Sequence, residues 1–71
     1  QMNSFAQYKL GLVHLKGSGV PKDIVLAHMW LDLAASNGNT SAKKVRDTLA
    51  SKMSRENLLE AQKRASEWEP N

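Results

Sequence analysis

The chain has 71 residues, of which 41% are hydrophobic and 24% charged, and this length suffices for one small domain and excludes a second. Its 10 Lys and Arg against 7 Asp and Glu give a formal net charge of +3, a mixed balance that does not by itself indicate a nucleic-acid partner. The absence of cysteine excludes a disulfide framework and a thiolate zinc site, and no apolar run approaches the roughly 18 residues of a membrane-spanning helix.

The first predicted helix covers residues 4 to 16, where Ser4 and Gln7 have the spacing of a capping box. Its apolar residues fall on two arcs, which predicts that it is covered from two directions. The arcs are Phe5, Tyr8, Leu12 and Leu15 on one side and Ala6, Leu10 and Val13 on the other. Gly11 lies mid-helix at a cost of roughly 1 kcal/mol against alanine. We therefore expect the backbone to approach Ala34 and Ala35 of the next helix closely at this point.

The segment GSGVPKD, residues 17 to 23, predicts a connector between two helices. Gly17 supplies a left-handed residue after the first helix, Pro21 cannot extend a helix backwards, and Asp23 is a good N-cap. As a phosphate-binding loop the segment would need a preceding strand and the G-x4-GK-S/T spacing, and it has neither.

The second predicted helix runs from residue 24 to about residue 37, ends before Gly38, and is apolar around most of its circumference. We expect it to be the most buried element. One strip at four-residue steps, formed by His28, Asp32 and Ser36, is polar and is expected to face solvent.

The third and fourth predicted helices complete the chain. Asn39 or Thr40 caps the third, which runs to about residue 53 with a single apolar stripe of Ala42, Val45, Leu49 and Met53. Ser54 caps the fourth, whose apolar face is Leu58, Ala61, Ala65 and Trp68. Four helices with short connections and no strand signal predict an all-α domain of two antiparallel helical hairpins.

An internal repeat organises these helices. Ala6 and Ala42 open equivalent helices 36 positions apart, close to the ~34 of tetratricopeptide-type helix pairs. Residues 6 to 42 read A-x3-LG-x5-G-x-GV-x2-D-x3-A-x2-W-x3-AA-x2-G-x3-A. This pattern closely resembles the Sel-1-like repeat, a relative of the tetratricopeptide repeat, with one departure at His14, where the family usually has a tyrosine. The resemblance implies an α-solenoid fragment that acts as a non-catalytic adaptor or scaffold, binds a protein or peptide on its concave helical face, and uses no cofactor.

Residues 43 to 71 fit the repeat pattern poorly, with Arg46 and Asp47 where leucine and glycine would stand. We interpret residues 4–38 as a complete hairpin and residues 39–71 as a degenerate carboxy-terminal capping hairpin, which together form one domain over residues 1–71. A terminal repeat turns a polar face to water where the next repeat would stack. Because the chain starts at Gln1 and not at a methionine, we expect a piece of a longer array.

No residues predict catalysis, metal binding or cofactor binding. No nucleophile with a paired base is found, and His28 with Asp32 supplies only two metal ligands. His14 is expected to pack against the second helix, and both tryptophans, Trp30 and Trp68, fall on apolar arcs and are expected in the core.

The predicted partner-binding surface lies on the first and third helices, because first helices of each pair line the concave face in solenoids of this type. Its residues are Phe5, Lys9, Leu12, Lys16, Val45, Thr48 and Lys52. A strip of this basic and apolar character predicts an acidic peptide with an apolar anchor as the ligand.

Three alternatives remain open for these surfaces. Phe5 and Leu12 could instead stack on an upstream repeat, and their exposure would then cause weak self-association. The basic third helix, with Lys43, Lys44, Arg46 and Lys52 against Asp47, could bind nucleic acid or an acidic partner, although no aromatic residues interleave with its basic ones. The domain could also be a purely structural cap of a longer solenoid.

Overall fold

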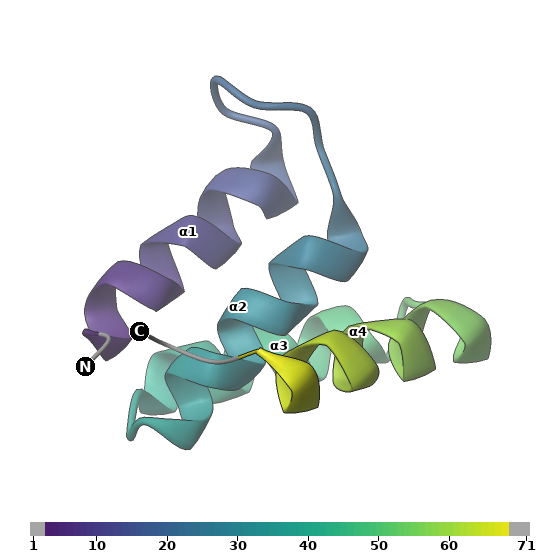
Figure 1. Ribbon diagram of the computed structural model, residues 1–71. Coiled ribbons are helices and arrows are strands. Elements are labelled where there is room, and N and C mark those ends of the chain that lie inside the picture. Colours follow the sequence, from purple (N-terminus) through teal and green to yellow (C-terminus); the bar gives the residue numbers. More distant parts are fainter. Residues whose placement is uncertain (1–2, 69–71) are drawn as a thin grey trace.

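The computed structural model describes residues 3–68, and within them the chain forms four helices and no strand. They are α1 (Ser4–Lys16), α2 (Ile24–Ser36), α3 (Thr40–Ala50) and α4 (Arg55–Glu67), arranged as Figure 1 shows. The all-α prediction is confirmed, and α3 ends three residues earlier than expected. Among the described residues, no helix has the length and hydrophobicity needed to cross a membrane.

Each helix begins at a side-chain cap, because the first amides of a helix have no partner within it. Oδ1 of Asp23 accepts from the amide of Leu26 at 3.0 Å, and Oδ1 of Asn39 accepts from the amide of Ala42 at 2.8 Å. The Ser54 hydroxyl accepts from the fourth helix in the same way. These three caps confirm the predicted starts of α2, α3 and α4.

The capping box predicted at the start of α1 is wrong. Asn3 caps this helix, with its Oδ1 accepting from the amide of Phe5 at 2.7 Å. Gln7 is fully buried, and its Oε1 accepts from Nδ2 of Asn37 at 2.9 Å, at the far end of α2. A side chain held between two helices is not free to reach back to the helix start, so Gln7 ties α1 to the end of α2 instead.

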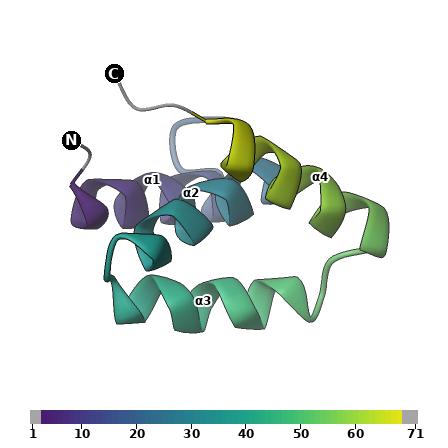
Figure 2. The ribbon, with the colours of Figure 1, turned by 60° about the horizontal axis from the view of Figure 1, so that its bottom comes forward.

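Helix α2 lies at the centre, and the other three helices pack against it (Figures 1 and 2). The contact between α1 and α2 is the most extensive of the three. The core cluster consists of Ala27, Leu31, Ala34, Ala42 and Leu49. The prediction that the second helix is the most buried element is confirmed, since it supplies three of these five residues.

At Gly11 the backbone of α1 lies close against α2. A Cβ atom at this position would lie 2.7 Å from Cγ of Leu31 and 3.3 Å from the carbonyl oxygen of Ala27. The predicted close approach is confirmed, but its partners are Ala27 and Leu31 and not Ala34 and Ala35. The two helices therefore meet one turn nearer to the start of α2 than the small residues suggested.

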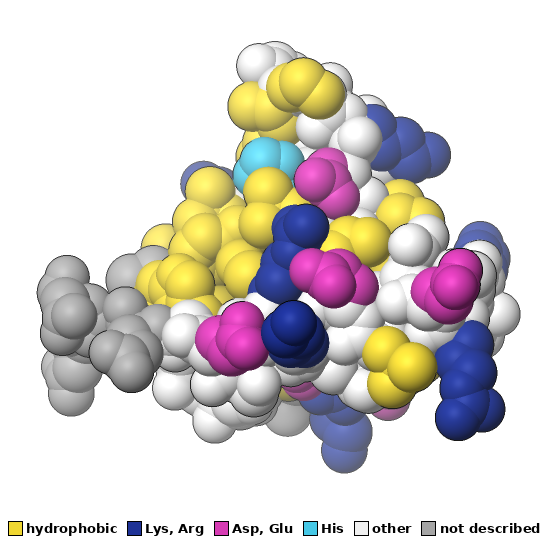
Figure 3. Space-filling model, turned by 45° about the vertical axis from the view of Figure 1, so that its right-hand side comes forward, with side chains coloured by type: hydrophobic (Ala, Val, Ile, Leu, Met, Phe, Trp, Pro, Cys, Tyr) yellow, Lys and Arg dark blue, Asp and Glu magenta, His cyan; other side chains and the backbone are white. Residues whose placement is uncertain are grey.

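Helix α1 is not covered from two directions. Phe5 is 59% and Leu10 36% exposed, and only Gln7 and Gly11 of this helix are buried. The reason is that α2 covers one side of α1, and the described chain supplies no second helix along the other side. Figure 3 shows hydrophobic side chains gathered on one face of the molecule, beside side chains of both charges.

The two tryptophans meet each other and only partly enter the core. The rings of Trp30 and Trp68 pack edge to face, with centroids 5.5 Å apart and planes at 69°. Both side chains are half-buried. The prediction that they are core residues is therefore only partly correct, because both remain partly exposed. They connect the end of α4 to α2 at the margin of the core.

Candidate functional site

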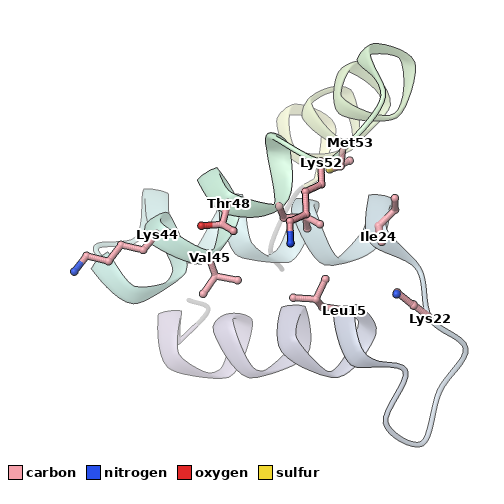
Figure 4. A pocket seen from close by; sticks show the side chains of 9 residues that line it. Leu15, Lys22, Ile24, Lys44, Val45, Thr48, Lys52 and Met53 are labelled. Atoms are coloured by element: carbon pink, nitrogen blue, oxygen red, sulfur yellow. The ribbon is translucent and has the colours of Figure 1, made fainter.

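A groove of about 540 Å³ lies between the end of α1, the start of α2 and the length of α3. Figure 4 shows the side chains that line it. Its floor is apolar and its rim is polar and basic. The floor residues are Leu15, Ile24, Val45, Leu49 and Met53, and the rim residues are Lys22, Lys44, Thr48 and Lys52.

Two parallel stripes on and just beyond α3 form one wall of the groove. Residues four apart lie on the same face of a helix, so Lys44, Thr48 and Lys52 make the rim stripe. Val45, Leu49 and Met53, each one position later, make the floor stripe. Leu49 is 7% exposed and anchors the helix in the core, while the ends of its stripe are half-buried and face the groove.

The connector between α1 and α2 closes one end of the groove, where Lys22 lines it (Figure 4). Gly17 has a φ of 72°, and its amide donates to the carbonyl of Val13 at 2.8 Å, which ends α1. The amide of Asp23 then donates to the carbonyl of His14 at 3.0 Å and returns the chain to α1. This closure places Lys22 and Ile24 beside Leu15 at one end of the groove.

The charge of the groove is entirely positive. Lys22, Lys44 and Lys52 line it together with no aspartate or glutamate. Within residues 3–68, none of these three lysines forms an ion pair. The groove therefore combines an apolar floor with uncompensated basic charge.

Arg46, on the same helix, is by contrast fully paired. Its guanidinium donates to Oδ1 of Asp32 at 2.8 Å and to Oδ1 of Asp47 at 3.0 Å. Burial opposes its charged form, but the hydrogen bonds to both carboxylates outweigh burial and raise the pKa of Arg46 above its usual value. The basic charge expected across the third helix is therefore reduced by the pairing of Arg46.

The strip of His28, Asp32 and Ser36 does not simply face solvent, as we had expected. Asp32 is covered by Arg46, and His28 is only 3% exposed. Desolvation lowers the pKa of His28, and Coulombic attraction from Asp32 offsets it only in part. No group within the described residues hydrogen-bonds Nδ1 of His28. This polar strip can lie against α3 because Arg46 of α3 forms an ion pair with Asp32.

Neither His28 nor His14 belongs to a metal-binding cluster within residues 3–68. Among the described residues, no group of three or more His, Cys, Asp or Glu side chains comes close enough to share an ion. His14 is half-buried, and its backbone carbonyl closes the connector onto α1.

The residues predicted to bind a partner separate into two sets in the structure. Val45, Thr48 and Lys52 of α3 line the groove, whereas Phe5, Lys9, Leu12 and Lys16 of α1 lie outside it. Lys9 and Phe5 are brought together on the surface of α1, with the ammonium group 5.4 Å from the ring centroid.

Six groove residues were missing from the predicted binding surface: Leu15, Lys22, Ile24, Lys44, Leu49 and Met53. A signal existed for four of them. Lys44 begins the four-residue stripe with Thr48 and Lys52, Leu15 follows Leu12 on the same apolar arc, and Leu49 and Met53 belong to the predicted apolar stripe of the third helix. For Lys22 and Ile24 there was none, since their place depends on how the connector closes onto α1.

Comparison with known families gives one finding. The model of the Sel1 repeat family matches residues 4–39, just over half of the chain. This stretch contains all of α1, the connector and all of α2. Neither a curated protein nor a solved structure shows a significant match to the chain.

Proposed function

The chain belongs to the Sel1 repeat family, and from this premise we propose that it is an interaction module whose groove between α1 and α3 binds a segment of a partner protein. Sel1 repeats generally mediate contacts between proteins, and the family is typically non-catalytic.

The observation that carries the proposal is the groove itself. Its volume of about 540 Å³ falls within the ~300–1,000 Å³ of ligand-binding pockets. Five apolar side chains form its floor and polar ones its rim, an arrangement typical of a recognition site. It also lies on the first helix of each pair, the face that solenoid proteins use for binding.

We also propose that residues 39–71 act as the capping hairpin of residues 4–38. The support comes from α4, where Ala61 packs inward and, apart from the exposed Leu59, the outer surface carries exposed charged residues of both signs. These are Arg55, Glu56, Glu60, Lys63, Arg64 and Glu67. A helix of this composition has a poor surface for stacking a further repeat.

Binding of nucleic acid through α3 has weaker support than binding of a protein segment. Arg46, the cation best suited to grip a phosphate, is occupied by Asp32 and Asp47. The remaining lysines border an apolar floor with no aromatic ring on which a base could stack.

The test is a selection from a random library of 12-residue peptides against the protein, followed by titration of the recovered peptides into ¹⁵N-labelled protein. We expect amide shifts to cluster at Leu15, Ile24, Thr48 and Met53. Thr48→Trp should weaken binding by about tenfold or more, because an indole on this exposed rim position fills the groove.

Gln62→Trp is the matched control, since it places the same ring at an exposed helical position on α4, away from the groove. It should leave peptide binding unchanged. Recovery of no peptide, or of peptides that bind Thr48→Trp as tightly as the parent, would contradict the proposal and leave the structural-cap role. Shifts at Phe5 and Tyr8 that grow with protein concentration alone would instead indicate self-association.

A further inference from the structure

We infer that the partner segment held in the groove is acidic, with carboxylates that reach Lys22, Lys44 and Lys52 around a central apolar anchor. This inference rests on the proposed function, because it names the chemistry of the segment that the groove binds.

Charge complementarity is the first reason. The half-buried cation Arg46 is balanced locally, because it meets two carboxylates, at 2.8 Å and 3.0 Å. The exposed Arg64 on α4 meets Glu60 at 2.9 Å. The three groove lysines have no such partner within residues 3–68, and no acidic side chain lines the groove. A bound segment that supplies the missing carboxylates is favoured electrostatically over a neutral or basic one.

The placement of the lysines around the floor is the second reason. Figure 4 shows Lys22 and Lys52 on either side of Leu15, with Lys44 at the other end beyond Val45. Lys44 lies six residues, or about 9 Å along the helix axis, before the end of α3 at Ala50, and Lys52 lies two residues beyond that end. A ligand therefore meets basic charge at both ends and apolar side chains between them.

This spacing sets the pattern expected of the ligand. Side chains about seven residues apart on a helical segment, or about four apart on an extended one, span roughly 10 to 13 Å on a single face. We expect acidic residues at one of these two spacings, with a large apolar residue between them that packs against Leu15, Val45 and Met53.

The exposed hydrophobic face in Figure 3 lacks this pattern of charge. Acidic and basic side chains both border it, so charge selects no partner there. The groove is distinguished by having one sign of charge around an apolar floor.

The experiment reads the composition of peptides selected from the random 12-residue library. We expect enrichment of aspartate and glutamate around one apolar residue and depletion of lysine and arginine. Changing the acidic residues of the best peptide to their amides should weaken its binding about tenfold, because each exposed ion pair is worth a few-fold in affinity. Raising the salt from 50 to 500 mM should weaken it several-fold.

Two triple variants distinguish an effect of the groove lysines from an effect of the net charge of the protein. Lys22→Gln, Lys44→Gln and Lys52→Gln together lower the formal charge from +3 to 0, as do Lys43→Gln, Arg55→Gln and Lys63→Gln at exposed positions outside the groove. Only the first variant should lose about tenfold in affinity for the selected peptide.

Selected peptides that are neutral or basic yet lose binding to Thr48→Trp would overturn the acidic ligand while leaving the groove as the binding site. Equal effects of the two triple variants would overturn it as well. Tighter binding of a 12-nucleotide single-stranded DNA than of any selected peptide, lost in the groove triple variant, would replace the acidic segment with a nucleic acid.

Discussion

Arg46 of α3 and Asp32 of α2 form an ion pair at 2.8 Å in which the two side chains are 23% and 27% exposed. In the 36-residue repeat, Arg46 stands at the position of Leu10 on α1. The contact between α2 and α3 therefore contains a charged pair where the repeat pattern has an apolar residue. Its pairing is what makes an arginine acceptable at a half-buried helix contact, since an unpaired charge there would be costly.

The first prediction concerns this pair. A double-mutant cycle with Asp32→Asn and Arg46→Gln should give a coupling energy of about 0.5–1 kcal/mol, at the upper end for partly exposed ion pairs. Urea denaturation measures it. The pair of Glu60 and Arg64 on α4, nearly half exposed, is the control and should give about 0.3 kcal/mol. Equal coupling in the two cycles would show that the α2–α3 pair contributes no more than a surface pair.

Gly11→Ala should destabilise the domain by about 1–3 kcal/mol, although alanine is the better helix former, because the new methyl group overlaps Leu31. Thermal or urea unfolding measures the loss. The same substitution in a Leu31→Ala background should cost less, since the crowding atoms are gone. A loss that is identical in both backgrounds would mean that Leu31 is not the obstacle.

Gly17→Val should lower the stability by more than about 1 kcal/mol, because a β-branched residue is strained at a φ of 72°. The added Cβ would also lie 3.3 Å from Cβ of Lys22, which crowds the connector. Ser18→Val is the matched control, since Ser18 is exposed and has no positive φ. If the two valine variants unfold at the same denaturant concentration, the connector tolerates a side chain at Gly17.

The stability should decrease as the pH falls from 7.5 toward 5.5, with His28 as one cause. Desolvation lowers the pKa of folded His28 below its usual 6.5, so the unfolded chain takes up the proton first. The stabilisation is complete above pH 6.5 and is lost as the pH falls toward the pKa of the folded state. The neighbouring charges are Asp32, Arg46 and Asp47.

Two measurements check this pH dependence. Urea denaturation of the parent and of His28→Gln should show a smaller loss of stability in the variant between pH 7.5 and 5.5. Independently of whether the variant folds, NMR titration of the His28 ring in the parent should give a pKa below 6.5. A pKa at or above 6.5 would mean that burial does not disfavour the charged ring.

Local features of the fold were predictable because they depend on neighbours within a few residues. Asp23, Asn39 and Ser54 could be assigned as caps from the residues that follow them, and the α3 stripe of Ala42, Val45, Leu49 and Met53 from its four-residue steps. The start of α1 was the exception. There a tertiary hydrogen bond to Asn37 drew Gln7 away from the helix end.

Three of the seven predicted binding residues line the groove and four do not, because their place depends on how the helices pack. The repeat period assigned α3 and α1 to the same surface, and Val45, Thr48 and Lys52 of α3 line the groove together with Leu15 of α1. Which side of α1 turns toward α3 depends on how α1 lies on α2. Because Gly11 meets Ala27 and Leu31, α1 presents Leu15 to the groove, and Phe5 and Lys9 remain on its outer surface.

The sequence by itself determined four helices, most of their ends, the glycine at a close contact between α1 and α2, and the membership of the Sel1 repeat family. These follow from hydrogen bonds and side-chain periods that span one or two helical turns. The tertiary structure alone decided that His28 is buried, that Arg46 forms an ion pair with Asp32, and that Lys22 and Lys52 line the same groove. Each of these depends on the rotation of one helix against another, which is set by packing across the whole core.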